Sequence, residues 1–210
     1  MSEFGYIPEA PEQSFGNNKG IFTPKDIYDL TRADKYTNYG QLELIETQTV
    51  SGSPTTLDFT SIKENEYNVL FMTISDLVHS GSTANIGFRY YESGVVETSG
   101  VYQYAQQRGT TAGSFTDTDR QTSSSYMLFT PASMNGGVGS FNAYSYFYNL
   151  GDSSKYSFAT WHSFSESTTT GFGFGSGVLK QASTVDGIQI YTFGRTLTSG
   201  TVSLYGLRFS

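Results

Sequence analysis

After residue 41, apolar and polar residues alternate in short runs that are separated by clusters of Gly, Ser, Thr and Asp. Alternation with a period of two is typical of strands that bury one face. The pattern predicts about ten strands: Gln41–Gln48, Thr56–Ile62, Val69–Ile74, Ile86–Tyr90, Val101–Ala105, Tyr126–Phe129, Phe141–Leu150, Tyr156–Phe164, Ile188–Ile190 and Val202–Leu204. This number of strands, with turns at short intervals, favours an all-β fold, an antiparallel β-sandwich or jelly roll.

Two segments depart from simple alternation. Val69–Ile74 is apolar on both faces, which predicts a central strand that is covered on both sides. Gln106–Ser125 is rich in Gly, Ser, Thr and Asp, and we expect it to form a long surface loop.

The first forty residues show no period of two and are rich in Pro, Gly and Asn. Thr23, Pro24 and Asp26 predict the start of one short helix, with a capping hydroxyl, a proline in the first turn and an acidic side chain beside it. We therefore expect an extended arm over residues 1–40, ahead of a β-sandwich domain over residues 41–210. Disorder of the arm remains an alternative, but its many apolar residues favour docking on a partner. The candidate anchor residues are Phe15, Ile21, Phe22, Ile27, Tyr28 and Leu30.

Charge and composition exclude several classes of partner. The formal net charge is −7, and no run of Lys or Arg occurs, which argues against binding to nucleic acid. No stretch approaches the roughly 20 apolar residues of a membrane helix, so no membrane partner is expected. The first ten residues lack the apolar core of a signal peptide, which predicts synthesis in a cytosol. Cysteine is absent, so there are neither disulfides nor thiolate metal sites.

Catalytic constellations are scarce. The two histidines are His79, which we expect in a loop, and His162, which we expect to be a partly buried packing residue. No serine lies in a G-x-S-x-G motif. Two carboxylate pairs occur, Glu64 with Glu66 and Asp117 with Asp119. The pair Asp117 and Asp119 lacks the third acidic ligand, the glycine and the closing Glu of an EF-hand, and we expect it in a solvated loop. We predict no enzyme activity, no catalytic residues, no metal and no cofactor.

Two patterns in the second half of the chain concern packing or binding. Glycines recur at every second position over 171–177, so on a strand they would leave one face bare for the close approach of a backbone or a large ring. Tyr144, Tyr146 and Tyr148 would share one face of a strand. These tyrosines could stack on sugar rings or meet another protein, or they could simply pack across strands at a sheet edge.

Three stretches carry a resemblance to a known group of proteins. Ser51–Ile62, followed by Tyr67 and Leu70, resembles the opening of jelly-roll domains in phage structural proteins, and Ile188–Ile190 with Gly200, Thr201 and Leu204–Leu207 resembles their ending. Asn18–Leu30 resembles the amino-terminal segment of decoration or fibre-like proteins of cyanophages and other marine phages. Residues 93–184 match nothing in this group.

The resemblance implies a non-enzymatic virion structural protein, a surface decoration or a fibre subunit. Its arm would attach to other virion proteins of the capsid or tail, and its β domain would face outward. The protein would be assembled in the host cytoplasm, located in the virion and homo-oligomeric, with a trimer as the expected form. The first alternative is a receptor-binding tail-fibre module that binds a host surface glycan. An enzyme, either a polysaccharide depolymerase or an esterase, is ranked last.

Overall fold

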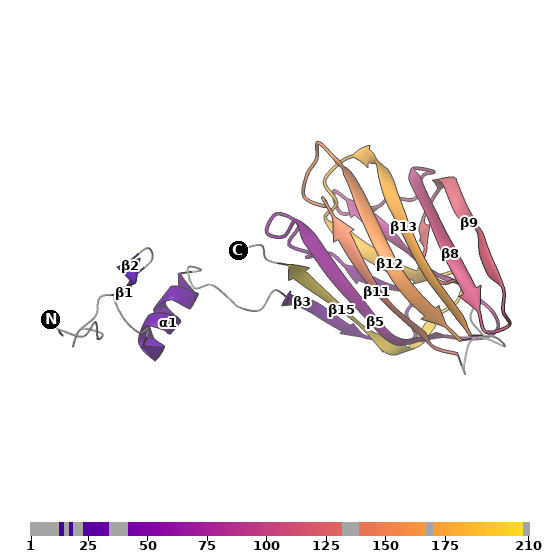
Figure 1. The fold of residues 1–210 in the computed structure, drawn as a ribbon, viewed down its shortest axis with the longest axis horizontal. Helices are drawn as coiled ribbons and strands as arrows, with labels where there is room; N and C mark the ends of the chain where they lie inside the picture. Colours follow the sequence, from indigo (N-terminus) through magenta and orange to yellow (C-terminus); the bar gives the residue numbers. More distant parts are fainter. Residues whose placement is uncertain are drawn as a thin grey trace. The chain divides into compact units, whose positions relative to one another are not determined.

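The computed structural model describes residues 13–14, 17–18, 23–33, 42–131, 139–166 and 170–207 (Figure 1). The chain divides into two compact units, Met1–Gln41 and Leu42–Phe209. Within the described ranges, no helix has the length and apolarity that crossing a bilayer would require.

The first unit contains the predicted short helix. α1 (Pro24–Arg32) begins at Thr23, whose hydroxyl accepts a hydrogen bond from the backbone N–H of Asp26, while the Asp26 carboxylate accepts one from the backbone N–H of Thr23. This reciprocal capping box satisfies two amide groups that would otherwise lack partners at the helix start. Two short strands, β1 (Gln13–Ser14) and β2 (Asn17–Asn18), pair antiparallel.

The second unit is built from four nested antiparallel pairs of strands. The outermost pair joins the first and the last strand of the unit, and each further pair lies between the two strands of the preceding pair in the sequence. The pairs are β3 (Leu42–Thr49) with β15 (Leu197–Leu207), β4 (Thr56–Phe59) with β14 (Gly187–Thr192), β5 (Val69–His79) with β11 (Phe141–Tyr148), and β6 (Ile86–Glu92) with β10 (Met127–Leu128). These pairs alternate between two sheets, which is the wrapping of a jelly roll.

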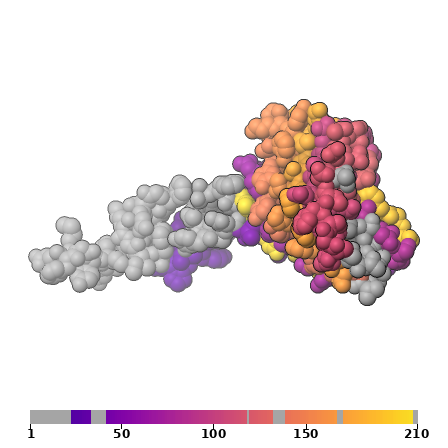
Figure 2. Space-filling view, turned by 45° about the vertical axis from the view of Figure 1, so that its right-hand side comes forward, coloured from indigo at the N-terminus to yellow at the C-terminus, as the bar shows by residue number. Residues whose placement is uncertain are grey.

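Four further strands extend one of these sheets. They are β8 (Tyr102–Thr110) and β9 (Phe115–Ser124), inserted between β6 and β10, and β12 (Tyr156–Ser165) and β13 (Gly171–Ala182), inserted between β11 and β14. The larger sheet then has the order β3-β15-β5-β11-β12-β13-β8-β9, and the smaller has the order β10-β6-β14-β4, with β7 (Val95–Val96) paired with β6. Figure 2 shows atoms of the inserted strands, in rose and orange, together on one side of the unit. The predicted antiparallel sandwich of jelly-roll type is confirmed.

The core lies between the two sheets. Large apolar side chains from both sheets are fully buried there, among them Phe59, Phe88, Phe129, Phe141 and Phe147. The rings of Phe88 and Phe129 lie 4.5 Å apart, centroid to centroid, and that of Phe147 meets Phe88 edge to face at 5.6 Å. Burial of such rings supplies most of the driving force for joining the sheets.

Two predictions about individual segments are wrong. Gln106–Ser125 is not a loop, because β8 and β9 form a hairpin whose turn contains Gly113 at a φ of +85°. The sequence of this hairpin does not alternate between apolar and polar residues, because polar residues such as Gln106 occupy inward positions. β5 is central as predicted, but only its inward face meets the other sheet. Its outward Phe71 is half-buried among the rings of Tyr144, Tyr146 and Tyr205.

Candidate functional site

The strands β12 and β13 turn their aromatic residues outward. On β12 the buried positions hold mostly small residues, Ser157, Ala159, Ser163 and Ser165, whereas Tyr156, Phe158 and Phe164 are exposed. β13 behaves in the same way, with glycines on its inner face and Phe172 and Phe174 on its outer face. The outer face of the larger sheet therefore carries an unusual concentration of exposed rings, and such a surface marks a site of interaction.

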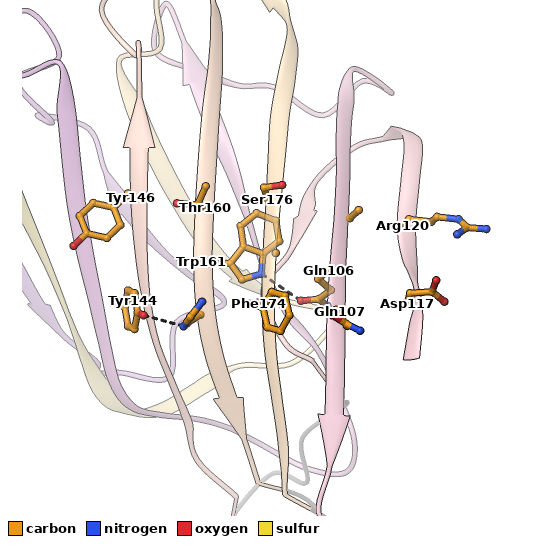
Figure 3. A pocket seen from close by; sticks show the side chains of 13 residues that line it. Gln106, Gln107, Asp117, Arg120, Tyr144, Tyr146, Thr160, Trp161, Phe174 and Ser176 are labelled. Carbon is orange, nitrogen blue, oxygen red and sulfur yellow. Dashed lines mark hydrogen bonds between the residues drawn. The ribbon is translucent and has the colours of Figure 1, made fainter. Parts of the chain in front are cut away.

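One large residue explains why the other inward side chains of β12 and β13 are small. Trp161 is the bulky inward side chain of β12, and its ring meets those of Phe88 and Phe129 edge to face at 5.6 and 5.9 Å. A Cβ at Gly175 would lie 2.6 Å from the Trp161 ring, so only glycine leaves room for the indole. The indole Nε1–H donates to Gln106 Oε1 at 3.2 Å, and the Gln106 amide donates to the Thr130 carbonyl at 2.9 Å. This arrangement, visible in part in Figure 3, supports the outer face from below.

The strand register aligns outward side chains into rows that cross the sheet. The first row consists of Tyr144, His162, Phe174 and Gln107, paired in that order on β11, β12, β13 and β8. Tyr144 Oη lies 2.8 Å from His162 Nδ1, and the His162 and Phe174 rings are 5.9 Å apart. We call this row the aromatic ridge.

The next row is different, because its three middle residues are small. It runs Tyr146, Thr160, Ser176, Ala105 and Arg120, paired in that order from β11 to β9. Tyr146 is packed on Phe71 with ring centroids 4.8 Å apart. Figure 3 shows this row beside the aromatic ridge. We call Thr160, Ser176 and Ala105 the floor.

A second ridge lies on the far side of the floor, with Phe158, Val178 and Gln103 on β12, β13 and β8. Two hollows result. One, of about 780 Å³, lies between the floor and the aromatic ridge, and the other, of about 430 Å³, lies between the floor and the second ridge. Both hollows are lined by all three floor residues and by Arg120. We call the two together the sheet groove.

The sheet groove offers apolar rings and neutral polar groups rather than a charged cluster. Its charged side chains are Arg120 and Asp117, both from the edge strand β9. Thr160, Ser176 and Gln107 point outward, and within the described part of the chain their side chains have no hydrogen-bond partner. These groups are therefore available to a ligand that presents hydroxyls.

The acidic pairs singled out in the sequence are not brought together. Asp117 lines the sheet groove, whereas Asp119 on the same strand forms an ion pair with Arg108 at 3.6 Å. Glu66 pairs with Lys63 at 3.6 Å, outside the groove. Over residues 42–131, 139–166, 170–207 and the described parts of the arm, no group of three or more His, Asp or Glu side chains could hold a metal ion.

The predicted ligand-binding tyrosines share the outward face of β11. Tyr144 and Tyr146 line the larger hollow, and Tyr148 lies one row further on. Of the predicted anchor residues, Ile27, Tyr28 and Leu30 lie on α1, where Tyr28 is 60% exposed and no residue is fully buried. Phe15, Ile21 and Phe22 lie outside the described residues.

Both predictions about the histidines are wrong. His79 is the last residue of β5 and is fully buried, with Nδ1 3.0 Å from the Ser80 carbonyl oxygen. His162 is exposed on the aromatic ridge rather than packed inside. The alternation was visible in the sequence, but which face of β12 is buried depends on Trp161, whose ring occupies the interior.

The sequence did not predict His162, Phe174 or the floor residues as part of a site. One signal could have done so. Glycines on one face of a strand leave Phe172 and Phe174 on the other, and if the glycine face is packed, the phenylalanines must face outward.

Comparisons with known proteins give little. No protein-family model matches the chain, and no curated protein matches it. Among solved structures, the CBM2 module of the evolved Dit of Lactobacillus casei BL23 phage J-1 is similar at a TM-score of 0.22 and 7% identity, over 74% of this chain and 70% of that chain. A likeness of this size carries no argument about fold or function.

Proposed function

We propose that this chain is a non-enzymatic protein of a bacteriophage virion whose arm attaches to the particle and whose jelly-roll domain binds a glycan of the host surface through the sheet groove. The resemblance of both ends of the chain to phage structural proteins supports the first half. The sheet groove supports the second half, and it favours the receptor-binding role over a purely structural one.

The observation that carries the binding role is the aromatic ridge beside a floor whose two hydroxyls, of Thr160 and Ser176, have no hydrogen-bond partner in the part of the chain that the structure describes. A sugar ring has apolar C–H faces and a rim of hydroxyls, so it is held by aromatic rings together with neutral donors and acceptors. Tyr146 and Phe174 supply rings, whereas Thr160, Ser176 and Gln107 supply hydrogen-bonding groups. A subunit interface in a homo-oligomer is the competing use of exposed rings, but its centre would be apolar and filled, not hollow and lined with hydroxyls.

The test of glycan binding is the effect of Tyr146→Ala on the isolated domain, measured on host cells and on a glycan array. Saturable binding by the unaltered domain should fall at least about tenfold in the variant. Tyr205→Ala is the matched control, because Tyr205 contacts Phe71 on the same face but lies outside the groove. Equal losses in both variants, or no saturable binding by the unaltered domain, would contradict the glycan-binding role.

Self-association through the same surface is distinguished by mass measurement in solution. If the unaltered protein forms an oligomer that Phe174→Thr dissociates, the aromatic ridge is a subunit interface. The glycan-binding proposal then fails. If the oligomeric state is unchanged in the variant, the surface remains available for a glycan.

Attachment through the arm is supported by the side chains of α1. Tyr28 is largely exposed and Ile27 and Leu30 are only half-buried within their own unit, so the helix presents apolar surface to a partner. A chain that starts at Gln41 should fold but should no longer be incorporated into particles. The double variant Ile27→Asp/Leu30→Asp should act in the same way, whereas Lys25→Ala, on the exposed side of the helix, should be incorporated normally. Normal incorporation of the truncated chain would overturn the anchor role.

A further inference from the structure

We infer that the sheet groove takes an extended, β-1,4-linked polysaccharide that lies across the strands, with one sugar over each strand. This inference rests on the proposed function and specifies its ligand class and orientation. It is carried by the order of the side chains in the three rows.

The direction follows from where the groove is open. Along β13, a ligand would run from Phe174 over Ser176 to Val178, and two large side chains would stand in its path. Across the sheet it would pass over Thr160, Ser176 and Ala105, which are all small and exposed. The rows on either side would then contact its two edges. Over β12, β13 and β8, the path perpendicular to the strands meets only small side chains, with Tyr146 and Arg120 at its two ends.

The spacing of the strands sets the repeat of the ligand. From Tyr146 on β11 to Arg120 on β9 there are four strand spacings, or about 19 Å. In an extended chain of pyranoses with equatorial linkages, each sugar advances by close to one strand spacing. Successive sugars would therefore meet equivalent positions on successive strands. A chain with α-1,4 linkages coils, so its sugars would leave the floor after one or two units.

The side chains of the groove suit such a ligand. The floor hydroxyls of Thr160 and Ser176 have no hydrogen-bond partner among the described residues and lie on adjacent strands, so each can hydrogen-bond a different sugar. On the aromatic ridge, the rings of His162 and Phe174 are likewise on adjacent strands and present apolar surface to the edges of two sugars. On β12 and on β13, each strand thus presents one hydroxyl and one ring, and this pair repeats once along the ligand.

The experiment titrates the full chain with cello-, xylo- and chito-oligosaccharides of two to six sugars by calorimetry, with maltohexaose as the coiled comparator. In at least one β-1,4-linked series, affinity should rise by about tenfold or more from the disaccharide to the tetrasaccharide and then level off. Maltohexaose should bind at least about tenfold more weakly than the hexasaccharide of that series. Affinity that is independent of length, or equal affinity for maltohexaose, would overturn the inference.

A variant that fills the floor tests the orientation. Ser176→Phe places a ring in the path across the strands and should weaken binding at least about tenfold. Ser199→Phe on β15 makes the same change at an exposed strand position outside the groove and should bind as the unaltered protein does. Thermal unfolding of both variants verifies that each is folded. Unchanged binding by a folded Ser176→Phe variant would contradict the path across the floor.

The outcomes separate this inference from the proposed function. Binding to host cells that depends on Tyr146, together with no binding of any β-1,4-linked series, would leave glycan binding standing and reject this ligand class. Absence of both would reject glycan binding itself.

Discussion

The nested strands of the jelly roll and the inserted strands β12 and β13 bury different kinds of side chain. The nested strands send large rings such as Phe88 and Phe147 between the sheets. The inserted β12 and β13 send mostly serine and glycine inward, and they display phenylalanines on the outer face. The first region builds the core and the second builds the surface of the candidate site. A strand's aromatic content therefore does not tell which of its faces is buried; the neighbour that fills the interior decides this.

The largest expected effect comes from a cavity in the nested region. Phe88 is fully buried and its ring contacts those of Phe129, Phe147 and Trp161. Phe88→Ala should lower the free energy of unfolding by about 3–5 kcal/mol, because the ring's burial is lost and a cavity remains. Chemical denaturation measures this loss. A change below about 1 kcal/mol would mean that this ring does not hold the sheets together.

A smaller loss should follow from crowding in the inserted region. Gly175→Ala would place a methyl group 2.6 Å from the Trp161 ring and 2.7 Å from Gln106 Cβ. Overpacking of this kind costs about 1–3 kcal/mol in the free energy of unfolding, measured as above. Ser176→Ala, the next residue and outward-facing, is the control and should change stability by less than about 0.5 kcal/mol. Equal stability of the two variants would contradict the tight packing of Gly175 against the Trp161 ring beneath the groove.

The exposed rings should contribute little to stability. Phe174 is 47% exposed, and Phe174→Thr should change the free energy of unfolding by less than about 1 kcal/mol while weakening ligand binding. On the same strand, Leu179 is fully buried, and Leu179→Ala should cost about 2–5 kcal/mol. Similar losses of unfolding free energy at the two positions would contradict the assignment of one face of β13 as buried and the other as exposed.

The smallest expected effect is a change in the pH dependence of Tm, and it concerns the junction of the two regions. There, Glu92 of β6 and nearby Glu97 both accept hydrogen bonds from the Gln181 amide near the end of β13. Hydrogen bonds from the side chain and backbone of Ser99 lower the pKa of Glu97 to about 2. Desolvation raises the pKa of Glu92, and a hydrogen bond to Glu97 acts in the same direction.

These shifts have opposite consequences for stability. The folded pKa of Glu97 lies below its unfolded value, so its contribution is present above about pH 4.5 and is lost as the pH falls toward 2. Glu97→Gln should therefore flatten the fall in Tm over that interval. The folded pKa of Glu92 is raised, so its contribution is present below the unfolded pKa and is lost as the pH rises. Glu92→Gln should accordingly raise Tm slightly at pH 7. Unchanged pH profiles of Tm in both variants would contradict the two assignments.

The fold was largely predictable from the sequence, and the candidate site was not. Alternation in β4, β6 and β11 is strong because large apolar residues face one core. The β8–β9 hairpin lacks this signal from Gln106 onward, since the inward Gln106 is held by a hydrogen bond from Trp161 rather than by apolar burial. The floor depends on register, because Thr160, Ser176 and Ala105 come from three strands that are aligned only by pairing. Nothing in the local sequence of any one strand reports such an alignment.

The pairing of the first strand with the last brings the two ends of the jelly-roll domain together, with Leu42 opposite Leu207. Both ends therefore lie at one edge of the larger sheet, next to β3 and β15. The centre of the sheet groove, at β13, is five strands from β3, or about 24 Å. A fusion partner or a surface linker at either terminus of the domain would hold it by that same edge, and the groove would stay accessible to polymers in solution.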